Sequence, residues 1–232
     1  MRTALIENIE KSEERTNVHG DETRRAIVLA AIRVIAENGV AGASLRAINV
    51  AAGSKNSSAA HYHFGTKLAM IEAALALVWS EVAPGQQLGL DALEAQVAEG
   101  KSLTARAVLE AVYDPYFALL ERPEFGLTTA KFVSRLLVES DADIQALLNQ
   151  TVATQMLRVL MLVSQALPEI PAEVLATRLF ITVTNVIHGS GDLAALGNSP
   201  LGDLYGGNTQ IFARHLFDYL AGAVSAPTVG TS

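Results

Sequence analysis

The sequence predicts an all-α fold, with a small N-terminal three-helix unit followed by a larger helical domain. Apolar residues recur at helical spacing along most of the chain, and no segment alternates with the period of two that is typical of strands. Helix caps and Gly or Pro breaks separate the periodic segments. Half of the 232 residues are hydrophobic, which is enough for a small module and a second domain with its own core.

The first elements follow a polar N-terminal stretch. Residues 1–20 show no periodicity and are expected to form a flexible arm. From Ile27 to Ile35, apolar residues follow the pattern of an amphipathic helix, and Asn38-Gly39 is a left-handed stop. Ser44 is a good N-cap for a second, short helix that Gly53 closes.

The turn-like stretch from Ser54 to Ser58 offers N-caps for a third helix, which reaches about His63. Thr66 can cap a fourth helix, which Pro84-Gly85 either ends or kinks. The remainder is helical, giving roughly nine helices in all. Its expected breaks are Gly100 to Ser102, Arg122-Pro123, Ser140-Asp141, Pro168 to Pro171 and Gly197 to Asn208.

The charge is unevenly distributed. The net charge of −7 alone argues against a nucleic-acid partner. However, the segment from Thr23 to Met70 contains six basic residues and one acidic residue, a net of +5. From Ile71 onward there are 8 basic and 17 acidic residues, a net of −9. A basic head on an acidic body suits a protein in which only the head approaches DNA phosphate.

The composition also indicates the cellular compartment of the protein. The chain has no Cys, which excludes disulfides and thiolate metal sites and is typical of a reducing cytoplasm. The N-terminus lacks the apolar region of a signal peptide. No unbroken apolar run approaches the ~18–20 residues that span a bilayer. We therefore expect a cytoplasmic protein without a membrane partner.

Three short helices with a tight turn between the second and third indicate a helix-turn-helix, whose third helix faces base edges in the major groove. Lys55 to Ser58 are the candidates for base contacts, because Asn can read adenine and Lys can read guanine. Ser44, His61, Tyr62 and Lys67 are placed to bind phosphate oxygens. The DNA-binding candidates are therefore Ser44, Lys55, Asn56, Ser57, Ser58, His61, Tyr62 and Lys67.

The same region resembles the DNA-binding domain of the TetR family of transcriptional regulators. The resemblance covers Thr23 to Ala73 and rests on the segments Ala26–Gly39, Ser44-Leu45, Ile48–Gly53 and the block HYHFGTK from His61 to Lys67. The sequence departs from the family's usual pattern in two ways. Asn49 replaces a usual Ala, and the stretch from Gly53 to Phe64 is one residue longer, which shifts the base-reading positions by one.

The resemblance implies a homodimer that binds a palindromic operator as a repressor and is released by a small-molecule effector, with no cofactor. The expected organisation is an arm (1–20), a helix-turn-helix domain (21–70), a helical effector-binding and dimerisation domain (71–225) and a flexible tail (226–232). Two late segments, Leu179 to Ile187 and Ile211 to Val224, are apolar on more faces than one core covers, which favours a dimer over a helix buried inside a monomer. The interface candidates are Val183, Ile187, Phe212, Phe217 and Leu220.

The larger domain mixes aromatic and Met residues with scattered polar groups, which suits an apolar cavity with a few orienting hydrogen bonds. The pocket candidates are Trp79, Tyr113, Phe117, Phe132, Arg135, Met156, Asn185 and His188; each of them can equally be a core or surface residue. No cationic cluster lies among them, so a hydrophobic or aromatic organic effector is expected.

Other classes of function are less well supported. No nucleophile–base constellation or Gly-rich phosphate loop suggests an enzyme. His61 and His63 point to different faces of a helix, so a metal site is not expected. A pure oligomerisation or adaptor module would explain the apolar late helices, but would leave the basic head and the HYHFGTK block unexplained.

Overall fold

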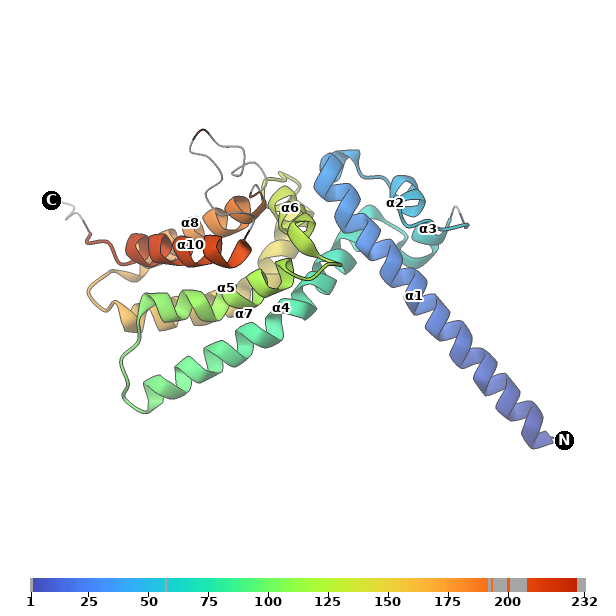
Figure 1. The fold of residues 1–232 in the computed structure, drawn as a ribbon, viewed down its shortest axis with the longest axis horizontal. Coiled ribbons are helices and arrows are strands. Elements are labelled where there is room, and N and C mark those ends of the chain that lie inside the picture. The colour runs from blue at the N-terminus through green and yellow to red at the C-terminus, as the bar shows by residue number, and fades with distance from the viewer. Residues whose placement is uncertain (1, 57, 192, 194–199, 201–207, 229–232) are drawn as a thin grey trace. The chain divides into compact units, whose positions relative to one another are not determined.

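The computed structural model describes the backbone of the chain except residues 1, 57, 192, 194–199, 201–207 and 229–232, and its side chains from Gly20 onward. The described part is helical and contains no strand, in agreement with the predicted fold class (Figure 1). It divides into two compact units, Met1–Ala74 and Leu75–Ser232. The helices are α1 (Arg2–Gly42), α2 (Leu45–Ala51), α3 (Ala59–Phe64), α4 (Lys67–Ala98), α5 (Ala105–Leu120), α6 (Gly126–Leu137), α7 (Ala142–Ala166), α8 (Ala172–Gly191) and α10 (Thr209–Val224).

In the first unit, α2 packs on α1 and α3, and α3 also contacts α1. Ile27 and Ile35 of α1 and Ile48 of α2 are fully buried, which confirms the face expected from the apolar spacing. Burying side chains of this size contributes about 1.5–3 kcal/mol each, so these contacts hold helices too short to be stable alone.

Three predicted helix ends of this unit are confirmed. Gly39 has a φ of 69°, the left-handed conformation that glycine adopts without a steric penalty, and it interrupts the helical dihedrals of α1. The Ser44 hydroxyl accepts a hydrogen bond from the Ala47 amide at 3.1 Å and caps α2. The Thr66 hydroxyl accepts one from the Ala69 amide at 3.1 Å at the start of α4.

The N-terminal stretch differs in one respect from the expectation. Helix α1 begins at Arg2, so residues expected to form an irregular arm belong to this helix. The flexibility of that stretch in solution stays a prediction.

The second unit contains α5 to α10 and most of α4. Its central contacts include Phe117 of α5, whose ring lies edge-on to those of Phe212 and Phe217 in α10, with centroids 6.1 and 5.7 Å apart. Helices α6 and α8 pack against each other, as do α5 and α10. The predicted breaks at Gly100, Pro123, Ser140 and Pro168 all fall between helices.

Two further expectations can be compared with the helix bounds. Helix α4 continues through Pro84 to Ala98, so the proline does not end it. The predicted break from Gly197 to Asn208 falls mostly outside the described residues, and α10 begins after Asn208, whose side-chain oxygen caps it. At the C-terminus, the Arg178 guanidinium binds the carbonyls of Val224 and Ala226 at 2.7 and 2.6 Å, which anchors the start of the expected flexible tail.

By length and composition alone, α4 and α7 could each cross a membrane. Arg158 of α7 donates hydrogen bonds to Glu94 and Asp91 of α4 at 2.8 and 2.6 Å. Such a charged cluster between the two helices suits water better than lipid, because a charged side chain inside a bilayer is costly.

Candidate nucleic-acid interface

The turn between α2 and α3 places the predicted base-reading residues differently from the expectation. Helix α3 begins at Ala59, so Lys55 and Asn56 belong to the turn and Ser58 is the N-cap. The predicted turn and a predicted N-cap, Ser58, are thus confirmed, whereas Lys55 and Asn56 lie four and three residues before the first residue of the helix. Ser57 lies outside the described residues.

Asn56 is exposed, but part of its side chain is already engaged. Its Oδ1 accepts a hydrogen bond from the Ser58 amide at 3.0 Å, and its carbonyl accepts one from the Ser54 hydroxyl at 3.1 Å. A bidentate contact with adenine needs the amide oxygen as acceptor and the amide nitrogen as donor. In this turn the oxygen is used to shape the backbone, which leaves the Nδ2 group for a contact with DNA.

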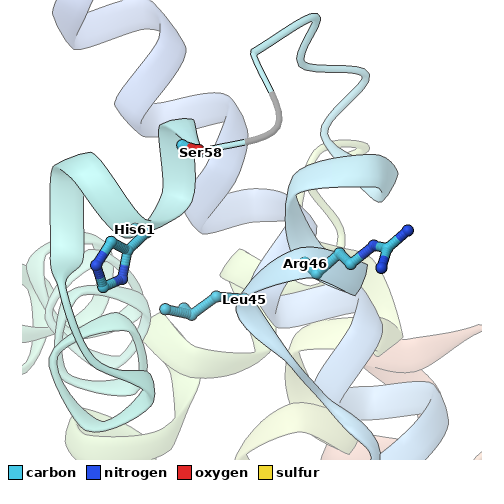
Figure 2. Close-up of a pocket in the computed structure, with 4 residues that line it drawn as sticks. All are labelled: Leu45, Arg46, Ser58 and His61. Atoms are coloured by element: carbon cyan, nitrogen blue, oxygen red, sulfur yellow. The ribbon is translucent and has the colours of Figure 1, made fainter.

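An open hollow of about 510 Å³ lies between the beginnings of α2 and α3 (Figure 2). Leu45 and Arg46 of α2 line it, together with Ser58 and His61. Figure 2 shows Leu45 pointing towards His61, whereas the Arg46 guanidinium points away on the other side of α2. Arg46, Ser58 and His61 are all exposed, so a hydroxyl and an imidazole lie at the hollow, and a cation lies on the outer side of α2.

Leu45 and Arg46 line this hollow but were not among the predicted DNA-binding residues. Arg46 was counted only towards the charge of the head. Arg46 lies two residues after the N-cap Ser44, on a short helix. This position could have indicated that Arg46 is exposed beside the third helix.

The aromatic residues of the HYHFGTK block are partly exposed and partly packed. Tyr62 is 84% exposed, and its ring meets that of His63 edge-on at 5.3 Å. His63 also lies against Phe64, and the Arg24 guanidinium lies 5.2 Å from the centre of the Phe64 ring. His63 thus packs locally, while Tyr62 is accessible to a partner.

Lys67 is half-buried at the start of α4. Its Nζ donates a hydrogen bond to the carbonyl of Val40 near the end of α1, at 3.0 Å. An ammonium group has three donors. The described bond uses one of them and holds the charge near the helix junction.

In the second unit, several pocket candidates turn out to be ordinary core or surface residues. Phe117 and Phe132 are fully buried, and Phe117 is packed against other rings, so these two side chains fill the core. Arg135 is exposed, which contradicts its expected place in a cavity. Asn185 is half-buried, and its Nδ2 donates to the Ile181 carbonyl of its own helix at 2.9 Å.

Four of the pocket candidates are half-buried or buried. Trp79, Met156 and His188 are half-buried, and Tyr113 is buried. His188 Nδ1 lies 2.7 Å from the Ser134 hydroxyl. Burial raises the pKa of the Tyr113 hydroxyl well above its usual value, so this group stays protonated and can donate a hydrogen bond.

Gln86 of α4 is a buried polar residue that sequence reasoning did not identify. It is 6% exposed, and its Nε2 donates to the Val112 carbonyl of α5 at 2.7 Å. Its Oε1 is buried without a hydrogen-bond partner among the described residues. Gln86 follows Trp79 by seven residues, so both lie on one face of α4.

The interface candidates are corrected by their burial within one chain. Phe212, Phe217 and Leu220 are at most 5% exposed, and Ile187 is 9% exposed, so they belong to the core of their own chain. Val183 is half-buried. The exposed apolar residues of α8 and α10 are instead Phe180 (73%), Ile181 (51%), Ile211 (39%) and Tyr219 (63%).

The first unit has a helix-turn-helix arrangement with exposed polar side chains, and the second unit is a separate helical domain. The family model of the tetracyclin repressor-like C-terminal domain matches residues 110–223. This match covers nearly half of the chain and relates its second unit to the C-terminal domain of TetR-type regulators.

Solved structures share the fold. A transcriptional regulator from Rhodococcus sp. Rha1 aligns with a TM-score of 0.56 at 23% identity, over 87% of this chain and 95% of its own. A TetR transcriptional regulator from Chloroflexus aurantiacus J-10-FL aligns with a TM-score of 0.54 at 19% identity, over 90% of this chain and 96% of its own. No curated protein matches the chain in sequence.

Proposed function

We propose that the protein is a repressor that binds a palindromic operator as a homodimer and leaves it when a small, largely apolar ligand binds. The observation that carries the DNA-binding part of this proposal is the set of exposed side chains on α2 and at the start of α3, namely Arg46, Ser58 and His61. The cation and the imidazole suit phosphate, while the Ser58 hydroxyl can reach base edges.

Within this proposal, Ser44, His61, Tyr62 and Lys67 contact phosphate, and Arg46 joins them. Lys55, Ser58 and the free amide group of Asn56 face bases, together with Ser57. In a dimer the two heads would reach successive major grooves about 34–36 Å apart. The test is a titration of the protein against duplex DNA at several salt concentrations. Strong binding with a steep salt dependence supports the proposal, and its absence at low salt contradicts it.

The proposed dimer interface uses the exposed apolar residues of α8 and α10, which pack side by side (Figure 1). Phe180, Ile181 and Tyr219 are all more than half exposed in the single chain. Covering such side chains contributes about 25 cal/mol per Å² of apolar surface. Sedimentation at micromolar concentration would test this, since a monomer would contradict the dimer.

The proposed effector site lies around Trp79, Tyr113 and Gln86, with Met156 and His188 as further candidates. The unpaired Gln86 oxygen favours an apolar effector that carries one hydrogen-bond donor, such as a hydroxyl or amide group. Screening such compounds for thermal stabilisation and for release of DNA tests this choice. Exclusive response to metal ions or nucleotides would contradict it. As a soluble regulator of this family, the protein is proposed to act in the cytoplasm.

A further inference from the structure

Asn49 is the buried polar residue at the centre of the turn between α2 and α3. It lies in the last turn of α2 and is only 3% exposed. Its Nδ2 donates a hydrogen bond to the Asn56 carbonyl at 2.6 Å. Its Oδ1 accepts one from the Ala60 amide at 3.1 Å. One side chain therefore joins α2 both to the turn and to the first turn of α3.

Helix α3 depends on this bond more than an ordinary helix would. It has six residues, and its N-cap Ser58 makes no side-chain capping bond. The first amides of a helix have no partner inside the helix, and a short helix is unstable alone. Ala60 is 1% exposed, so water cannot readily replace the missing acceptor. Asn49 supplies, from the preceding helix, the cap that the local sequence does not.

The bond also connects the two walls of the hollow. Ala60 lies between Ser58 and His61, which line one wall, and Asn49 belongs to the same helix as Arg46, which lines the other. A change in the direction of α3 relative to α2 would alter the spacing of these side chains. We propose that Asn49 is a positioning residue that sets the DNA sequence preference through the placement of α3, without touching DNA. This inference rests on the proposed DNA-binding function.

The experiment compares sequence preference with general affinity. A randomised duplex library of about 30 base pairs, long enough for two half-sites, is enriched with the wild-type protein. The affinities of the wild type and its variants are then measured for an enriched duplex and for a scrambled duplex. For Asn49→Ala we expect the ratio of the two affinities to fall about tenfold, the effect of losing one helix cap. Affinity for the scrambled duplex should stay within about twofold, because every basic residue is retained.

Two variants calibrate this result. Asn49→Asp keeps an acceptor for the Ala60 amide and loses the donor to Asn56, so its ratio should lie between those of the wild type and Asn49→Ala. Asn38→Ala is the matched control, since Asn38 makes one bond, from Nδ2 to the Val34 carbonyl of its own helix at 3.2 Å. Its ratio should equal that of the wild type.

Amide hydrogen exchange separates this inference from the DNA-binding proposal. The Ala60 amide should exchange faster in Asn49→Ala than in the wild type, while the Ile48 amide of α2 should change little. An unchanged affinity ratio, or an equal loss for both duplexes, would overturn the positioning role. If the wild type bound no duplex, the DNA-binding proposal would fail, and the positioning role would fail with it. The Ala60 exchange would then show whether Asn49 still caps α3.

Discussion

Gln86→Met is a substitution whose effect can be worked out from two opposing terms. Methionine has nearly the length of glutamine but neither donates nor accepts a strong hydrogen bond. The change removes the bond from Nε2 to the Val112 carbonyl, which contributes about 0.5–1.5 kcal/mol. It also removes the buried, unpaired Oε1, whose burial costs about 1–3 kcal/mol.

The two terms together should raise the free energy of unfolding of the variant by about 1 kcal/mol. For a chain of this size, this raises the melting temperature by about 2–4 °C. Thermal unfolding followed by circular dichroism measures this shift. Gln87→Met is the matched control, because Gln87 is exposed and its replacement should change stability by less than about 0.5 kcal/mol. A clear fall in the melting temperature of Gln86→Met would show that the carbonyl is paired in solution.

The same variant tests the proposed effector contact. An effector that donates a hydrogen bond to Gln86 should bind about tenfold more weakly to Gln86→Met, equivalent to about 1.4 kcal/mol. Trp79 is the only tryptophan and lies on the same helix face, so its fluorescence can follow the titration. Equal affinities for the wild type and the variant would mean that the effector lies elsewhere.

Three further predictions concern DNA, assembly and pH. Lys67→Ala should weaken binding to all duplexes about equally and lower the salt slope by about one unit, as measured by titration; an unchanged slope would contradict a phosphate contact. Phe180→Arg should give folded monomers in sedimentation because Phe180 is 73% exposed, whereas Phe217→Arg should unfold the chain because Phe217 is 3% exposed; a dimeric Phe180→Arg protein would place the interface elsewhere. Burial raises the pKa of Tyr113 and Tyr116, so the free energy of unfolding should fall as pH rises above about 10, where the unfolded tyrosines ionise first. Denaturant titrations should show a smaller fall for Tyr116→Phe, and an identical fall would contradict this assignment.

Features that depend on a few neighbouring residues could be predicted from the sequence. The left-handed Gly39 and the caps at Ser44 and Thr66 each involve atoms at most three residues apart, and all three agree with the structure. The same local logic places the breaks between the later helices.

The side chain that caps α3 could not be predicted in this way. Ser54 to Ser58 contain several possible caps, and local rules favour a helix that starts among them. The helix does begin after Ser58, but the capping bond comes from Asn49, which binds residues seven and eleven positions further along the chain. The two departures from the family pattern, Asn49 and the longer turn, are thus parts of one arrangement. The side chain that replaces the usual alanine holds the longer turn in place.

The proposed dimer face shows a different limit of the sequence. Leu179 and Thr182 of α8 are buried, while the adjacent Phe180 and Ile181 are 73% and 51% exposed. A helix that is apolar on every side has no polar face to indicate which residues its own chain covers. The sequence therefore predicted that two faces of α8 are covered, one by its own chain and one by a partner. It did not indicate which apolar residues belong to which face. Phe212 and Phe217 of α10 pack against Phe117 and so belong to the core of one chain. A partner chain would therefore have to contact the exposed apolar residues, such as Phe180 and Tyr219.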